Sequence, residues 1–307
     1  MSPLEQSIVR TLTYFDLVDY PLTKEELFSY LWRPPFGRYD DFLTALESGS
    51  QKWENKWGYY FLSGREHIVE NRRVRLLPSE QKLRLARRAA KKIRSVPFLR
   101  AIFLCNSVAS GTAGESSDID FFIIADPKRI WLVRFFTNFI LKLFGWRTYG
   151  QKIRNRICLS FYVDGGHLDI SPLRAVPEDI HFIYWLYQML PLYDPDNYND
   201  KFLKANKWAG DYLPNLKKEN LPISDSAFQN SRLGLIWKKI WEKMWSVGYG
   251  DLLESQAKGF QLAMMKKNIK SMADMGDNSV VIGDSVIKLH ENDTRKEYYE
   301  KWKSRIN

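Results

Sequence analysis

The sequence predicts an α/β protein of the α+β kind, with a mixed sheet between a helix-rich N-terminal region and a mostly helical C-terminal region. Short apolar runs at residues 98–105 and 118–124 predict two buried β-strands, because each is rich in Ile, Leu and Phe. Apolar residues recur with helical spacing over much of the remaining chain. At 307 residues the chain is long for one domain. We therefore expect three domains, at 1–75, 76–193 and 194–307.

Composition narrows the class of protein. The formal net charge of +10 favours polyanionic partners such as nucleotides and nucleic acid, although a merely basic soluble protein has the same balance. The two cysteines lie in apolar runs and the four histidines are scattered, which indicates neither a disulfide framework nor a clustered zinc site. The first residues lack the basic-then-apolar pattern of a secretory signal. We expect a cytoplasmic protein.

The first 70 residues predict three helices followed by a hairpin. The helices are expected at 4–18, after Thr23 and at 39–48, and two β-like runs lie within 52–62. Thr23 and Glu26 have the spacing of a capping box. This order of elements resembles a winged helix-turn-helix.

A winged helix-turn-helix either reads DNA or docks another protein or a substrate. The presumed recognition helix carries Asp40, Asp41 and Glu47, which is a poor surface for phosphates and favours docking. Lys52 and Lys56 in the wing keep DNA binding open.

A basic helix is expected at 79–94. Arg84, Arg87, Arg88 and Lys91 share one face of it, at the spacing of neighbouring turns. This face is either an ordinary solvated surface or a surface for a polyanion, and the lack of acidic residues between Glu80 and Glu115 favours the polyanion.

The segment between the two strands carries the candidate site. Asp118 and Asp120 are two residues apart at the start of the second strand, so both side chains project from the same face of the sheet. Two adjacent carboxylates repel each other unless a cation neutralises them. A hard divalent ion binds through one or two carboxylates together with substrate phosphates. The preceding loop, 106–117, can bring backbone N–H groups and the Ser107 hydroxyl onto a phosphate.

This strand-loop-strand pattern resembles the nucleotidyltransferases of the DNA polymerase β superfamily, over about residues 95–170. In that family a hydrophobic strand, Gly-Ser or Gly-Gly, a loop and Asp-x-Asp follow one another. Here Asn106-Ser107 precedes the loop and Asp118-Ile119-Asp120 follows it. The resemblance implies the nucleotidyltransferase fold and transfer of a nucleoside monophosphate from a nucleoside triphosphate to a hydroxyl. It makes Asp118 and Asp120 catalytic ligands of Mg²⁺ or Mn²⁺, and Asn106 and Ser107 nucleotide-binding residues. The acceptor would be RNA, DNA, a protein or a small molecule.

Two departures from the family pattern bear on catalysis. Asn106 stands where the family usually has glycine. The family's third carboxylate lies on a later strand, yet the apolar run 157–163 contains no acid. Asp164 lies in a turn, which leaves Asp169, on an expected return strand, as the candidate third catalytic carboxylate; a solvent-facing turn residue is the alternative. Without a third carboxylate, the enzyme would be slow or would depend on a base in the substrate; the alternative is a catalytically inactive, nucleotide- or nucleic-acid-binding regulatory module.

The remaining chain predicts an aromatic helix at 177–193, a loop-rich boundary at 194–223 and a helical region at 228–272. Trp237, Trp241 and Trp245 recur every four residues, which favours core packing. A face for a partner or a membrane surface is the alternative, but we do not expect membrane-surface contact. A strand pair at 279–289 and a helix at 294–306 complete the prediction.

Overall fold

The computed structural model describes residues 1–35, 38–48, 51–216, 230–246, 248–265, 269, 272–273, 276 and 278–306. The central prediction, an α/β protein with a mixed sheet, is confirmed. The predicted boundary stretch 194–223 and helical region 228–272 lie partly outside these residues.

The N-terminal unit has the predicted order of elements. It consists of α1 (Pro3–Asp16), β1 (Leu22–Thr23), α2 (Lys24–Ser29), α3 (Tyr39–Glu47), β2 (Trp53–Lys56) and β3 (Tyr59–Leu62). The predicted capping box at the start of α2 is confirmed, since the side chains of Thr23 and Glu26 each accept the other's backbone N–H. The short strand β1 pairs with β3 in the order β1-β3-β2, which the sequence did not indicate.

Helix α4 (His67–Ile93) is a single helix of 27 residues that begins well before the predicted 79–94. Pro78 lies inside it, although proline removes a helical hydrogen bond. Contacts with the N-terminal unit explain why the first half is helical all the same. The guanidinium of Arg72 pairs with the Glu26 carboxylate at 2.6 and 2.8 Å, and Arg75 donates to the Val18 carbonyl at 2.8 Å.

Six strands form the central sheet, in the order β7-β4-β5-β6-β9-β8. They are β4 (Leu99–Cys105), β5 (Ile119–Ala125), β6 (Ile157–Asp164), β7 (Leu190–Tyr193), β8 (Val280–Ile282) and β9 (Val286–Leu289). Only β5 and β6 run parallel among these pairs, and the others are antiparallel. Every residue of β5 is buried, because β5 is covered on both faces.

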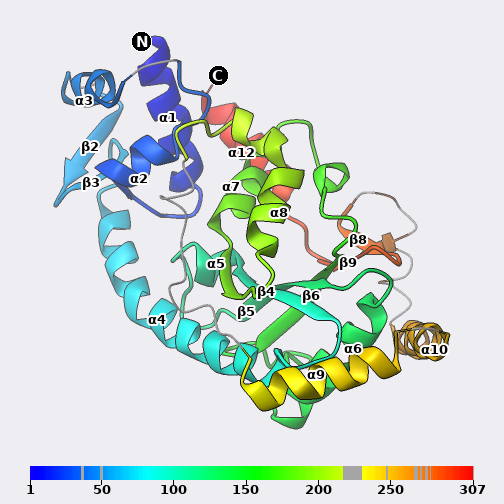
Figure 1. Cartoon of the computed structure of the whole chain (residues 1–307). Helices are drawn as coiled ribbons and strands as arrows, with labels where there is room; N and C mark the ends of the chain where they lie inside the picture. Colours follow the sequence, from blue (N-terminus) through cyan, green and yellow to red (C-terminus); the bar gives the residue numbers. More distant parts are fainter. Residues whose placement is uncertain are drawn as a thin grey trace.

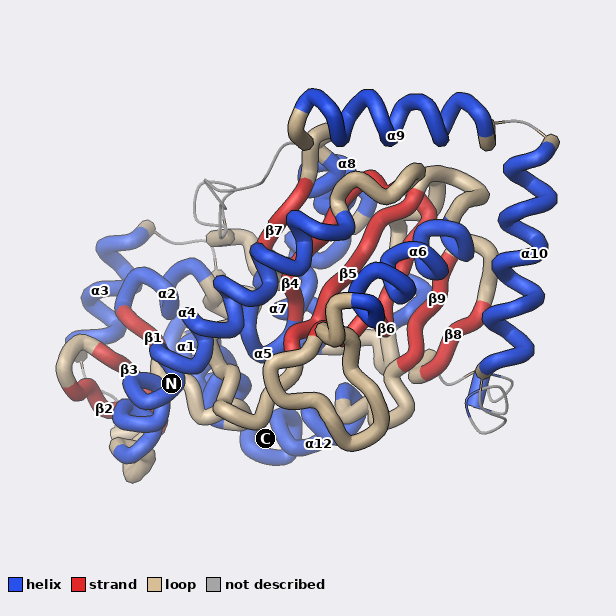
Figure 2. The backbone as a smooth tube through the Cα atoms, turned by 90° about the horizontal axis from the view of Figure 1, so that it is seen from below, coloured by secondary structure: helices blue, strands red, loops and turns tan. Residues whose placement is uncertain are grey.

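Helices cover the two faces of this sheet (Figures 1 and 2). On one face, α7 (Ile180–Gln188) and α8 (Tyr198–Ala205) pack with the N-terminal unit and α12 (Arg295–Ile306) in one hydrophobic core. On the other face, α4 and α6 (Ile130–Leu143) form a second core, joined by α10 (Tyr249–Met264). Short elements α5 (Asn106–Ala109), η1 (Ser171–Leu173) and η2 (Lys207–Asp211) lie in the connections, and α9 (Arg232–Met244) crosses the strand ends.

Three elements differ from the prediction. Residues 190–193 form the edge strand β7 instead of the end of the aromatic helix, because an edge position tolerates Pro191. Residues 167–170 form no strand; the chain there turns into η1. Residues 198–205, in the stretch predicted to be loop-rich, form the helix α8, whereas α9 and α10 agree with the predicted helical region 228–272.

The C-terminal region contacts both the N-terminal unit and the central sheet. Strands β8 and β9 extend the central sheet from β6, and α12 packs against α1, so the two marked chain ends lie near each other (Figure 1). The Trp302 indole N–H donates to the Arg10 carbonyl at 2.8 Å, and its ring meets Trp32 edge to face. Among the helices of the described chain, none has the length and apolar character needed to cross a membrane.

The buried Trp302 gives a test of this packing. We expect Trp302→Ala to lower the free energy of unfolding by about 3–5 kcal/mol, the usual cost of removing a buried aromatic side chain. Trp237→Ala, at an exposed position of α9, should change it by about 0.5 kcal/mol or less. Chemical denaturation followed by circular dichroism measures both. Equal effects of the two substitutions would contradict the docking of α12 onto α1.

Candidate metal centre

Strand β5 positions the two predicted aspartates. It lies between β4 and β6, and the register places Asp120 opposite Cys105 on one side and Cys158 on the other. Asp118 immediately precedes the strand, two residues from Asp120, so both carboxylates lie on the same face. This is the face covered by α7.

Asp118, Asp120 and Cys158 form a compact group. Each offers one ligand atom, and these three atoms lie within 4.8 Å of one another, so the group could hold a metal ion. Two of the three residues are the predicted metal ligands. The third, Cys158, was not predicted.

The pair of carboxylates is electrostatically unfavourable without a cation. Burial, followed by the nearby charge of Asp118, raises the pKa of Asp120 to about 7, although a hydrogen bond from Asn106 partly offsets both. Burial also raises the pKa of Asp118, against the lowering effects of Arg147 and Lys82. A bound cation would reverse this balance, because it stabilises the ionised form of both carboxylates.

Cys158 occupies the place on β6 where a third ligand would stand. Asp120 pairs with Cys158 and Phe122 with Phe161, so β6 holds one extra residue between these pairs. Such a β-bulge turns Cys158 and Phe161 to the same face of the sheet. Burial, followed by the charge of Asp120, raises the pKa of the Cys158 thiol to about 12, so the thiol is protonated at neutral pH.

Asp169, the predicted third carboxylate, does not join this group. It is exposed, and its carboxylate accepts the backbone N–H of Ser171 at 2.8 Å, as a turn residue does. Asp164 lies opposite Ala125, at the far end of β5 from Asp120. Its carboxylate accepts the N–H groups of Lys128 and Gly166. Backbone hydrogen bonds therefore account for the positions of Asp164 and Asp169 without a role for either acid at the metal group.

Asn106 has a structural reason to stand where the resembled family has glycine. Its φ of 57° lies in the left-handed region, which glycine favours and asparagine tolerates better than most residues. The side chain also links two parts of the site. Its Oδ1 accepts the Trp185 indole N–H at 2.8 Å, and its amide hydrogen-bonds to Asp120. Ser107 follows, half-buried in the first turn of α5.

Lys82 is a site residue that was missed by the sequence prediction. It is buried, and its ammonium donates to the carbonyls of Glu115 and Ser117 and to the Asn155 side chain, at 2.6 to 3.0 Å. These bonds hold the loop before Asp118 against the loop before β6. Lys82 lies one turn before Ala86 on the apolar stripe of α4, and a lone cation on that stripe was the available signal.

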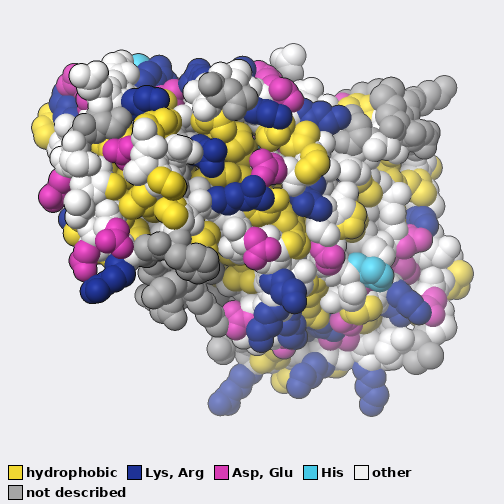
Figure 3. Space-filling model, turned by 90° about the horizontal axis from the view of Figure 1, so that it is seen from above, with side chains coloured by type: hydrophobic (Ala, Val, Ile, Leu, Met, Phe, Trp, Pro, Cys, Tyr) yellow, Lys and Arg dark blue, Asp and Glu magenta, His cyan; other side chains and the backbone are white. Residues whose placement is uncertain are grey.

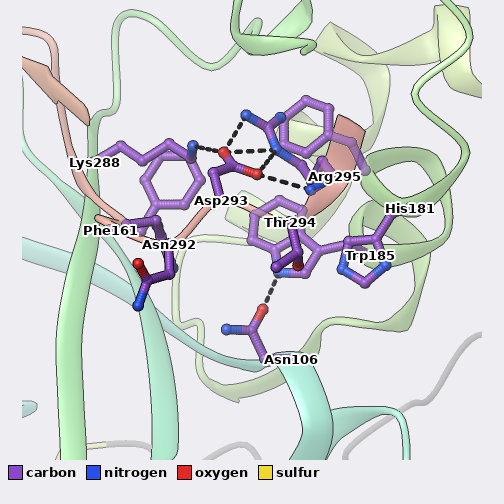
Figure 4. Close-up of a pocket in the computed structure, with 11 residues that line it drawn as sticks. Asn106, Phe161, His181, Trp185, Lys288, Asn292, Asp293, Thr294 and Arg295 are labelled. Atoms are coloured by element: carbon purple, nitrogen blue, oxygen red, sulfur yellow. Dashed lines mark hydrogen bonds and ion pairs between the residues drawn. The ribbon is translucent and has the colours of Figure 1, made fainter. Parts of the chain in front are cut away.

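A pocket of about 180 Å³ (Figure 4) adjoins the metal group through Asn106, which hydrogen-bonds to Asp120. Asn106 forms part of its wall, and the aromatic rings of Phe161 and Phe182 stack on either side of Trp185, at centroid distances of 5.6 and 5.4 Å. Strand β9 and the segment after it supply the opposite wall, which includes Lys288 from the strand and His290, Asn292, Asp293, Thr294 and Arg295 from the segment.

The charges of this pocket are already paired. Asp293 lies 2.6 Å from both Lys288 and Arg295, and despite burial the hydrogen bond and charge of Arg295 hold the pKa of Asp293 well below its usual range. Burial, followed by the charge of Lys288, lowers the pKa of His290 to about 4, so this imidazole is neutral at neutral pH. Its Nε2 lies 3.2 Å from the Ser160 hydroxyl, while its buried Nδ1 has no hydrogen-bond partner among the described residues.

No family model, curated protein or solved structure matches this chain. The site itself combines two carboxylates that could bind a cation with an aromatic, charge-balanced pocket. Such a pocket suits a planar, neutral ring that offers hydrogen bonds.

The repulsion between the two carboxylates gives a test. In metal-free protein at about pH 8, above the raised pKa of Asp120, we expect Asp120→Asn to increase the free energy of unfolding by about 1 kcal/mol, because it removes the buried member of a pair of like charges. Asp164→Asn is the matched control, since that buried carboxylate is fully hydrogen-bonded; it should lower stability by about 1–3 kcal/mol. Thermal denaturation with and without a chelator measures both. Destabilisation by both substitutions alike would contradict a cation site at Asp120.

Proposed function

We propose that this protein transfers a nucleoside monophosphate from a nucleoside triphosphate to a hydroxyl acceptor, with Mg²⁺ or Mn²⁺. The observation that carries the proposal is the convergence of Asp118 and Asp120 on one face of β5, just after the turn at Asn106 and Ser107. This is the arrangement that the resemblance to the DNA polymerase β superfamily implies.

The residues fit a hard divalent ion. Asp118 and Asp120 offer carboxylate oxygens, which such ions prefer, and substrate phosphates commonly complete the coordination. The protonated thiol of Cys158 is a soft group and a poor ligand for Mg²⁺. When bound, such an ion supplies positive charge to the phosphoryl group that is transferred.

The chain's own residues bind the triphosphate, the base and the acceptor. Asn106 and Ser107 lie at the turn that faces the triphosphate, and the pocket beside Trp185 accepts the planar base of the nucleotide. Exposed Arg84, Arg88 and Lys91 on α4 favour a polyanionic acceptor such as RNA or DNA, with a protein as the alternative. Figure 3 shows Lys and Arg side chains spread over one face and projecting from its lower edge.

A second candidate function is a binding module without catalysis. One observation favours it: Cys158 stands where a third carboxylate would assist removal of the acceptor's proton, and a thiol with a pKa of about 12 is not a useful base at neutral pH. Such a module would bind nucleotide or nucleic acid and regulate a partner.

Label transfer separates these candidates. The full chain is incubated with each triphosphate labelled at its α-phosphate, with Mg²⁺ or Mn²⁺, and with RNA, DNA or cell protein as acceptor. We expect the wild type to transfer label to one acceptor class, and Asp169→Ala to do the same. Joint Asp118→Ala and Asp120→Ala substitution should lower the rate of label transfer at least about a hundredfold. Calorimetric binding of metal and triphosphate without label transfer would favour the binding module. If the double substitution left the binding of metal and triphosphate unchanged, both proposed functions would be ruled out.

Cys158 offers a gain-of-function test. We expect Cys158→Asp to increase the rate of label transfer by about tenfold or more, because it restores a carboxylate beside Asp120 that can accept a proton or hold an ion. Cys158→Ser is the control, since it keeps the size of the side chain without adding a charge. Equal rates for the two variants, with both folded by circular dichroism, would show that the third position does not limit the reaction.

A further inference from the structure

Helix α9 presents its apolar side to solvent. Large hydrophobic residues recur on its outer face at helical spacing, and they are between 51% and 79% exposed: Leu233, Ile236, Trp237, Ile240 and Met244. A helix on the surface of a globular protein normally turns such a face toward the core. Core packing, the prediction for the tryptophans, is therefore wrong for Trp237; Trp241 and Trp245 are partly buried.

Specific polar contacts fix this orientation. The inner face of α9 carries Lys238, which is buried and donates to the Leu99 carbonyl and to the Tyr193 hydroxyl. One turn later, the Glu242 carboxylate accepts the Phe98 N–H at 2.6 Å and pairs with Arg100 at 2.8 Å. These bonds hold the polar side of α9 against the start of β4. Rotating the helix to bury its apolar side would leave these buried groups without partners, at a cost of about 1–3 kcal/mol each.

The exposed face of α9 is also positively charged. Arg232, Lys239 and Lys243 are exposed beside the hydrophobic residues. Glu242 is the only acidic residue in the helix, and its carboxylate is bound on the inner side. The outer face thus combines apolar side chains with cations and contains no acid.

A groove between α6 and α10 repeats this combination. It has a volume of about 630 Å³, and its lining includes the exposed hydrophobic residues Phe139, Phe260 and Met264. Arg134, Lys142 and Arg147 supply its charges, and no carboxylate is among the described residues that line it. Helix α6 contacts the end of α9 through the stacked rings of Phe136 and Trp245. Exposed apolar surface is therefore shared by α6, α9 and α10, and exposed cations accompany it on α6 and α9.

Anionic lipid matches this surface better than a second copy does. In a symmetric dimer through α9, the cations of one copy would face those of the other and repel them. Lipid phosphates attract the same cations, while the boundary between headgroups and acyl chains accommodates the hydrophobic residues and favours tryptophan. At 13 residues α9 is too short for a span, which needs about 20, so the contact would lie in the plane of the surface.

We propose that α9 docks this protein on an anionic lipid surface, with Leu233, Ile236, Trp237, Ile240 and Met244 in the headgroup–acyl boundary and Arg232, Lys239 and Lys243 on lipid phosphates. This surface lies apart from the candidate metal centre, so the inference does not depend on nucleotidyl transfer. It also reverses the expectation that membrane-surface contact is absent.

Vesicle flotation of the full chain tests the proposal. We expect the wild type to float with vesicles of phosphatidylcholine and phosphatidylglycerol, and to remain mostly unbound with phosphatidylcholine alone. Joint Trp237→Ser and Ile240→Ser substitution should weaken binding at least about tenfold. Joint Lys239→Gln and Lys243→Gln substitution should weaken binding to the anionic vesicles by about thirtyfold, and added salt should do the same for the wild type.

Joint Leu76→Ser and Leu77→Ser substitution is the matched control, since both leucines are exposed on α4 and should not affect flotation. Circular dichroism establishes that each variant is folded. Failure of the wild type to float would overturn the proposal. So would a dimer in light scattering that the Trp237 and Ile240 substitutions dissociate, because α9 would then bind a second copy. The lysine variant, whose changes are exposed and conservative in size, keeps the test decisive if the apolar variant fails to fold.

Discussion

The pairing of β5 with β4 on one side and with β6 on the other is the constraint on which the rest of this structure depends. Each residue of β5 is buried, so the strand cannot shift without exposing apolar side chains and breaking ladder hydrogen bonds. That register places Asp120 between Cys105 and Cys158. The same register separates the two apolar cores, since successive β5 residues face α7 and α6 alternately.

The buried carboxylates are tolerated because cations surround the group. Lys82 ties the loop before Asp118 to the loop before β6, and Arg147 lowers the pKa of both aspartates. These cations offset the burial only in part, since the pKa of Asp120 stays near 7. A pair of carboxylates whose charge the protein compensates only in part is suited to a divalent ion, because the ion supplies the remaining positive charge.

The C-terminal region links the central sheet to the N-terminal unit. Its two strands extend the central sheet, its last helix packs on α1, and the segment between them forms one wall of the pocket beside Trp185. Helix α9 is fixed by Lys238 and Glu242 with its apolar side outward. A polar anchor of this kind is specific, because the buried charges have partners in one orientation only. The pocket and the exposed helix therefore both result from contacts between segments far apart in the chain.

The sequence by itself determined the α/β class, the two apolar strands, the capping box at Thr23 and the pair Asp118 and Asp120, because strand periodicity and caps depend on residues close together in the chain. Tertiary structure decided the rest. Cys158 reaches Asp120 through strand pairing and a bulge, helix docking brings Lys82 to the loop before Asp118, and Asp169 stays in its turn. The orientation of α9 likewise depends on the hydrogen bonds of Lys238 and the ion pair of Glu242 with Arg100, which apolar periodicity does not indicate. Local patterns specify which side chains share a face, whereas only the assembled sheet specifies which faces meet.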